Sequence, residues 1–247
     1  MTTAAHPRRR ARRGEGERLR DEILAAAREL LAETKDADAV SVRAVAERVG
    51  VSTPSIYLHF ADKAALLDAV CEAVFADLDR RMEESAAAVT DPFDGLRTRG
   101  LVYVTFALEN PEQYRLAMMR VPGHAGMSTS QPFSADDIVA GPTYHHMTIA
   151  VQKCIDVGVF APGTDAEQVC TALWAAAHGA VSLCLAKPGL AGEHAIALCE
   201  MVITNAGLGA ALASYLGDGT GHDAGPDGES FDISGALATL LRSLPQI

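Results

Sequence analysis

Four side chains that can form hydrogen bonds through hydroxyl, phenol or imidazole groups lie close together in the chain: Thr53, Ser55, Tyr57 and His59. Small hydroxyls and a phenol suit hydrogen bonds to the phosphates and base edges of DNA. A helix that begins just before them would also favour a phosphate at its N-terminus. By composition alone these are ordinary exposed helix residues, so their meaning depends on the elements that hold them.

Two short helices joined by a tight turn are expected to position these side chains. Val42, Val45, Ala46 and Val49 recur at i, i+3, i+4 and i+7, which predicts one apolar face of a short helix. Gly50 supplies the left-handed residue that can end this helix without a Cβ clash. Such a pair of helices is a helix-turn-helix, whose second helix enters the major groove of DNA.

The second helix of this motif is expected to start at Ser52, a natural N-cap, with Pro54 in its first turn. Ile56 and Phe60 form its buried side, which leaves the hydrogen-bonding residues outward. The helix carries no Arg, Asn or Gln. Strong bidentate recognition of guanine or adenine must therefore come from elsewhere or be absent.

The segment resembles the DNA-binding domain of TetR-type transcriptional regulators over residues 18–83. The resemblance is carried by Ser52-Thr53-Pro54-Ser55, by Ile56-Tyr57-Leu58-His59-Phe60, by Asp62-Lys63-Ala64-Ala65-Leu66-Leu67, and by a preceding amphipathic helix with Ile23, Leu24, Ala27, Leu30 and Leu31. It implies that Tyr57, His59 and Lys63 contact phosphates, whereas Thr53 and Ser55 lie in the groove. Ser41 and Arg43 open the first helix of the motif and form a plausible second phosphate clamp.

Weaker features extend the resemblance beyond residue 83. They are the run Pro111-Glu112-Gln113-Tyr114-Arg115-Leu116 and the placement of Trp174 four residues before His178-Gly179. The second spacing resembles a subgroup of TetR-type ligand domains with a Trp…His-Gly signature.

The net charge of −11 is unevenly distributed along the chain. Residues 1–63 carry 12 Lys and Arg against 10 Asp and Glu, whereas the remainder carries 9 against 22. We expect Arg8, Arg9 and Arg10, in the basic run at residues 8–13, to belong to a DNA-contacting arm; the alternative is a solvated tail. A basic end on an acidic body suits a protein that presents only one end to phosphates.

The rest of the chain shows helical periodicity throughout, which predicts an all-α protein. The expected helices lie at about 18–34, 62–88, 93–108, 111–121, 142–158, 165–186, 192–215 and 233–243, with Pro and Gly in the connections. The Gly- and Asp-rich segment 217–230 is expected to be a mobile loop. We expect a flexible arm at 1–16, a DNA-binding domain at 17–66 and a ligand-binding and dimerisation domain at 67–247.

Several function classes lack support in the sequence. The five cysteines are widely spaced and form no CxxC pair, which favours reduced core cysteines in a cytoplasmic protein. No run of 18 apolar residues is free of charges and helix breakers, which argues against a membrane span. We find no metal-ligand spacing, nucleophile motif or phosphate-binding glycine loop. We therefore expect no metal, no cofactor and no enzymatic activity.

The second domain offers a candidate effector pocket. Its apolar helices carry aromatic, methionine and histidine side chains that could line a cavity: Tyr103, Phe106, Met118, Met119, His145, Trp174 and His178, with His124 and Met147. Trp174 and His178 share one helix face because they are four residues apart. For any single member, packing in the core is the alternative, and for the Trp174–His178 pair both interpretations stay open.

The resemblance also implies a homodimer in which the helices at about 165–186 and 192–215 pair with their twins in a four-helix bundle. Both helices are nearly free of charge in the middle, and we expect Gly207 and Ala211 to lie in this interface. A two-fold dimer would read both halves of a palindromic double-stranded operator. An unknown small molecule in the second domain would release it, acting through the 62–88 helix. One alternative is an orphan or activating regulator without such an inducer, and another is a helical enzyme or binding protein with a chance helix-turn-helix.

Overall fold

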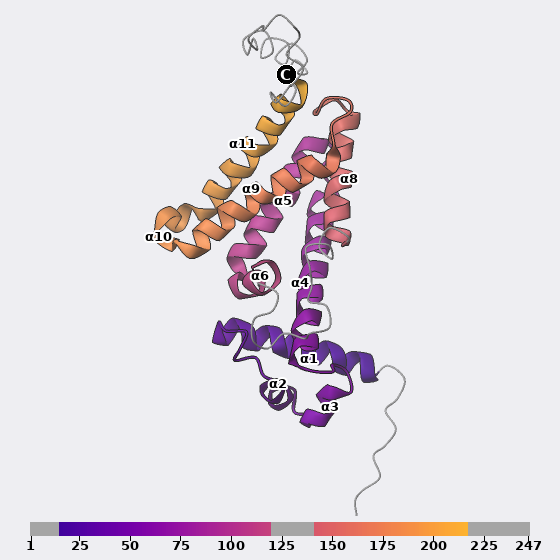
Figure 1. Cartoon of the computed structure of the whole chain (residues 1–247), viewed down its shortest axis with the longest axis vertical. Helices are drawn as coiled ribbons and strands as arrows, with labels where there is room; N and C mark the ends of the chain where they lie inside the picture. The colour runs from indigo at the N-terminus through magenta and orange to yellow at the C-terminus, as the bar shows by residue number, and fades with distance from the viewer. Residues whose placement is uncertain (1–14, 120–140, 217–247) are drawn as a thin grey trace, which may run out of the picture. The chain divides into compact units, whose positions relative to one another are not determined.

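The computed structural model describes residues 15–119 and 141–216, and within these ranges its regular structure is helical (Figure 1). The predicted all-α fold class is confirmed. The chain divides into two compact units, one of Met1–Phe75 with Glu112–Ser134 and one of Ala76–Pro111 with Ala135–Ile247. The predicted domain boundary at residues 66 and 67 falls inside a helix that begins in the first unit and ends in the second.

The first unit contains α1 (Glu15–Thr34), α2 (Val42–Val49), α3 (Thr53–Tyr57), the beginning of α4 (Lys63–Ala86) and most of α6 (Pro111–Met118). The apolar stripe predicted for α1 is buried along its whole length, namely Ile23, Leu24, Ala27, Leu30 and Leu31. The facing helices complete the core with Val42, Val45, Ala46, Ile56, Phe60, Leu66 and Val70.

The turn between α2 and α3 has the geometry that the sequence predicts. Gly50 is left-handed, with φ 76° and ψ 30°, and the N–H of Val51 donates to the carbonyl of Ala46 at 2.9 Å. At the other end of α2, the Ser41 hydroxyl accepts a hydrogen bond from the N–H of Ala44 at 3.1 Å. Both ends of α2 are therefore closed, and the direction in which the chain enters α3 is set by the turn.

The second unit contains the end of α4 with α5 (Pro92–Glu109), α8 (Pro142–Asp156), α9 (Ala166–Ala186), α10 (Pro188–Ala191), the 3-10 helix η1 (Gly192–His194) and α11 (Ala195–Leu216). α11 packs against α9 and α5, and α8 packs against the same two helices. One core cluster joins these elements, formed by Leu96, Ala150, Val151, Cys154, Phe160, Cys170 and Ala211.

The predicted helix at about 192–215 begins later than the sequence suggests. Gly192 has φ 54°, which lies outside the right-handed helical region, and η1 precedes the α-helical part that starts at Ala195. The short helix α10 uses Pro188 as its first residue, where the missing N–H costs nothing. The predicted loop at 217–230 and helix at 233–243 lie outside the described residues.

Replacing Gly50 by Ala should destabilise the protein through backbone strain alone. A Cβ at this position would meet no atom within 4 Å, so the cost is that of placing an L-residue at φ 76°. We expect a loss of about 1–2 kcal/mol in the free energy of unfolding, measured by urea titration, and a smaller loss for Gly50→Asn, since Asn adopts this conformation more readily. Equal stability of the Ala variant and the wild type would contradict this account of the turn.

Candidate nucleic-acid interface and effector site

The N-terminus of α3 differs in one detail from its prediction. Ser52 occupies the N-cap with extended backbone angles, as expected, but its side chain forms no capping hydrogen bond. Its hydroxyl is instead hydrogen-bonded to the hydroxyl of Ser55, with 2.8 Å between the two oxygens. The expected side-chain cap is therefore wrong, and the two hydroxyls are held together at the start of the helix.

The outward side of α3 carries the predicted contact residues around one exposed aromatic ring. Tyr57 is 52% exposed, whereas Ile56 beside it is fully buried in the core of the unit. Leu58 is 76% exposed, and the sequence analysis did not single it out because it has no polar group. The other predicted residues of this helix and its cap, Ser52, Thr53, Pro54 and Ser55, are partly or fully accessible. His59 is also partly accessible, but it lies in the turn after α3, which ends earlier than predicted.

Lys63 is held at the start of α4 by the loop that joins α1 to α2. Its ammonium donates to the carbonyl of Asp38 at 2.8 Å and lies 3.6 Å from the carboxylate of the same residue. Its side chain is 24% exposed, so the cation is positioned at the surface rather than free. In α2, Arg43 is exposed and Ser41 is half-buried. Three further predicted contacts, Arg8, Arg9 and Arg10, lie outside the described residues.

An ion-pair network that the sequence analysis missed joins α2 to α1. The guanidinium of Arg48 contacts the carboxylate of Glu33 at 2.6 Å and that of Glu29 at 3.4 Å. The hydrogen bond from Arg48 lowers the pKa of Glu33. All three groups are solvent-accessible, so the network contributes little to stability and mainly orients α2 on α1. No local sequence signal identifies it, since the partners are 15 and 19 residues apart.

Three of the predicted effector residues form one hydrogen-bonded cluster in the second unit. The indole N–H of Trp174 donates to the Tyr103 hydroxyl at 3.3 Å, and that oxygen lies 3.3 Å from Nδ1 of His178. Tyr103, on α5, is buried, and the two residues of α9 are half-buried. Burial lowers the pKa of His178 and so favours its neutral form. The cluster presents uncharged polar groups in an apolar setting.

Ser182 extends this cluster along α9. It lies one turn beyond His178, and its hydroxyl oxygen is buried without a hydrogen-bond partner among the described residues. An unsatisfied buried hydroxyl costs about 1–3 kcal/mol, so it favours a water or ligand atom nearby. The spacing of four residues from His178 was a signal that the sequence analysis did not use.

The other predicted effector residues are placed differently. Phe106 is buried under the guanidinium of Arg81, which lies 5.3 Å from its ring centroid. His145 is exposed on α8, and Met147 is half-buried against the core cluster. Met118 and Met119 end α6, in the first unit. His124 lies outside the described residues.

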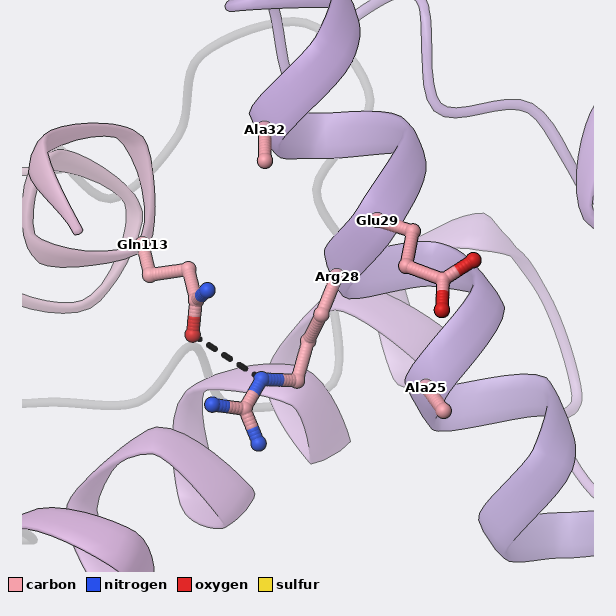
Figure 2. Close-up of a pocket in the computed structure, with 5 residues that line it drawn as sticks. All are labelled: Ala25, Arg28, Glu29, Ala32 and Gln113. Atoms are coloured by element: carbon pink, nitrogen blue, oxygen red, sulfur yellow. Dashed lines mark hydrogen bonds between the residues drawn. The ribbon is translucent and has the colours of Figure 1, made fainter.

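A separate surface cavity of ≈ 300 Å³ lies in the first unit and contains none of the predicted effector residues. Figure 2 shows Arg28 of α1 reaching towards Gln113 of α6, to which its Nε donates at 2.9 Å. The rest of the lining comes from α1, namely Ala25, Glu29 and Ala32. No local sequence pattern predicts this cavity, because Arg28 and Gln113 on its two walls are 85 residues apart.

α9 and α11 have large apolar side chains on an exposed face. Leu183 is 49% exposed, Met201 53% and Leu208 55%. Small residues accompany them on α9, where Ala172 and Gly179 are also exposed. By length and composition alone, both Ala166–Ala186 and Gly192–Leu216 could cross a membrane, although this is weak support for a span. No membrane span is predicted from the sequence, because charged residues and helix breakers interrupt its apolar runs.

Gly207 and Ala211 do not lie on this exposed face. A Cβ at Gly207 would come within 3.1 Å of the ring of Phe93, and Ala211 belongs to the core cluster of its own chain. The prediction that these two residues form the interface is wrong, because both face the interior of their own unit. The exposed side of the same helix carries Met201 and Leu208 instead.

Comparison with known proteins finds two family matches along the chain. Residues 23–70 match the family described as bacterial regulatory proteins, tetR family, and residues 96–205 match the family described as tetracyclin repressor-like, C-terminal domain. Over 55 residues the chain is 46% identical to the tetracycline repressor protein class A from transposon 1721 of Escherichia coli. This match covers 22% of this chain and 25% of that protein.

A second curated relative is the nucleoid occlusion factor SlmA of Vibrio cholerae, 30% identical over 108 residues, or 44% of this chain and 53% of that protein. The matches thus span between a quarter and about half of these relatives. Among solved structures, a protein of unknown function from Rhodococcus sp. RHA1 is 26% identical with a TM-score of 0.64, covering 82% of this chain and 98% of that one.

Replacing His178 by Gln should flatten the acid side of the stability profile. The lowered pKa of His178 means that the unfolded chain takes up a proton at a higher pH than the folded chain does. The contribution of neutral His178 is therefore complete above the unfolded pKa of about 6.5 and is lost as the pH falls towards the folded value. We expect the urea midpoint of the wild type to fall more steeply below about pH 6.5 than that of the variant.

His194→Gln provides the control, because the His194 side chain is 79% exposed. Its profile should follow that of the wild type. If the urea midpoints of all three proteins fall equally with decreasing pH, the explanation based on a buried neutral His178 is wrong.

Proposed function

Because the chain belongs to the TetR family of bacterial regulatory proteins, we propose that it is a repressor that binds a palindromic operator as a homodimer and is released by a small-molecule ligand. The family assignment makes it a DNA-binding transcription regulator and not an enzyme. The observation that carries the finer proposal is the outward face of α3, with its exposed phenol and paired hydroxyls beyond the Gly50 turn. The name of the tetracycline repressor, a relative over 55 residues, supports a repressing role.

In this proposal the residues of the motif divide into two roles. Tyr57, His59 and Lys63 contact phosphates, with Ser41 and Arg43 as a second clamp and Arg8, Arg9 and Arg10 as an arm. Thr53 and Ser55 face base edges in the major groove, and Ser52 and Pro54 set the start of the helix. The tethering of Lys63 to Asp38 supports the phosphate role, because a pre-positioned ammonium loses less side-chain entropy on binding.

The proposed homodimer uses the exposed faces of α9 and α11. Large apolar side chains beside small ones allow two helices to approach closely, and a single chain leaves this surface in water. TetR-family regulators are soluble DNA-binding proteins, so we assign these faces to a second copy of the chain rather than to a membrane. The dimer would act in the cytoplasm, where its two helix-turn-helix motifs would bind the two halves of a palindromic operator.

The proposed ligand site centres on Tyr103, Trp174 and His178, with Ser182 beside them. Their neutral hydrogen-bonding groups suit an uncharged molecule that carries a hydroxyl or carbonyl. Phe106 and His145, in the same unit, are weaker candidates. A coupling of about 1–3 kcal/mol between ligand and operator corresponds to a 5–150-fold change in affinity, which is enough for a switch.

Substitutions on α3 should separate positioning from sequence recognition. Tyr57→Phe and Lys63→Ala should weaken binding to all DNA sequences alike, whereas Thr53→Ala and Ser55→Ala should change which operator positions matter. The experiment selects bound fragments from a random DNA pool with each variant and then measures affinity for the best sequence and for a scrambled one. Unchanged selectivity of Thr53→Ala, with altered selectivity of Tyr57→Phe, would overturn the proposed orientation of α3.

Introducing a charge at Leu208 should dissociate the dimer. An unpaired carboxylate buried between helices costs several kcal/mol, so Leu208→Asp should raise the dimer dissociation constant at least about a hundredfold. Sedimentation velocity gives the mass, and binding to a full operator should fall to the level of a half-site. Ile149→Asp, at an exposed apolar position of α8, is the matched control and should remain dimeric. A dimeric Leu208→Asp variant would move the interface to another surface.

A further inference from the structure

Two cysteine side chains meet where α9 and α11 pack together. The Sγ atoms of Cys184 and Cys199 are 3.9 Å apart, and both residues are buried, at 5% and 0% exposure. They are 15 residues apart in the chain and come from different helices, so no local motif marks them. DNA recognition does not involve this pair, nor does the effector cluster around Tyr103.

We propose that Cys184 and Cys199 form a two-coordinate site for a soft monovalent cation such as Cu(I). Thiolates are the protein ligands that Cu(I) prefers. With metal–sulfur bonds of about 2.3 Å, as in zinc thiolates, a sulfur separation of 3.9 Å gives an angle of about 115° at the metal. Both sulfurs can therefore reach one ion in a bent arrangement, whereas a linear arrangement needs a sulfur separation of about 4.6 Å.

The number of ligands selects the class of ion. Structural zinc takes four protein ligands and catalytic zinc three. Within residues 15–119 and 141–216, no group of three or more His, Cys, Asp and Glu residues could hold a metal. A two-ligand site in apolar surroundings therefore suits an ion that is satisfied by two thiolates.

Metal binding at this pair releases protons, and its balance is 2 RSH + Cu⁺ → [RS–Cu–SR]⁻ + 2 H⁺. Affinity for the ion should therefore increase with pH.

The site would join the two helices to which we assign the dimer surface. A bound ion would fix the separation of α9 and α11 near Cys184 and Cys199. The inference does not depend on the proposed operator or ligand, because it rests only on the packing within one chain.

Titration of the full, reduced chain with Cu(I) under anaerobic conditions, against a chromogenic Cu(I) chelator, tests the proposal. The wild type should retain about one Cu(I) per chain, and retention should increase with pH. Cys184→Ser and Cys199→Ser should each abolish it. Cys71→Ser is the matched control: this thiol is also buried, lies in the first unit and donates to the carbonyl of Leu116 at 3.7 Å, as a serine could.

Two further measurements keep the outcome decisive if a serine variant folds poorly. Cys184→Ala and Cys199→Ala should show wild-type circular dichroism without retaining Cu(I), and X-ray absorption of the loaded wild type should show two sulfur neighbours. The proposal is overturned if the wild type yields its Cu(I) to the chelator, if the Cys184 and Cys199 variants retain as much as the control, or if the absorption spectrum shows nitrogen or oxygen ligands.

Discussion

Helices that are apolar on every side impose the main constraint on the second unit. A helix such as α9 or α11 is stable in water only when its whole circumference is covered. Within one chain, α5 and α8 cover the inner side, where the ring of Phe93 comes close to Gly207. The outer side, with Met201 and Leu208, has no such cover in the single chain. Core packing, the proposed dimer and the contact between Cys184 and Cys199 all follow from this need for cover.

The first unit is held by a different interaction, because several of its charged side chains form ion pairs with one another. Arg48 is held by Glu33 and Glu29, and Lys63 is tied to Asp38. Among the described residues, these ion pairs reduce the positive charge that can attract DNA over a long range, and the remainder of the protein is acidic. The proposed recognition therefore combines the phosphate contacts with short-range hydrogen bonds from hydroxyls and a phenol, which follow the turn at Gly50.

The sequence predicted those parts of the fold that have a periodic or capping signal. The apolar stripe of α1 and the left-handed turn at Gly50 are examples. The orientation of α11 could not be predicted, since a helix that is apolar all round has no preferred inner face, and Gly207 was assigned to the wrong side. Pairs distant in sequence, such as Arg48 with Glu33, carry no local pattern. In the effector site, the i, i+4 spacing predicted that Trp174 and His178 share a helix face. It could not predict their hydrogen bonds to Tyr103, which is more than 70 residues away in the chain.

The alternation of large and small residues on the outer faces of α9 and α11 has a consequence for the identity of the partner. On α9, Leu183 is exposed one turn from the exposed Gly179, and Ala172 is exposed two turns before that glycine, so the surface has large and small side chains at fixed positions. A related regulator in the same cell would carry large and small side chains at other positions. Large side chains of the two proteins would then collide in a mixed dimer. Shape alone would then disfavour mixed dimers, and each dimer would contain two identical DNA-binding domains.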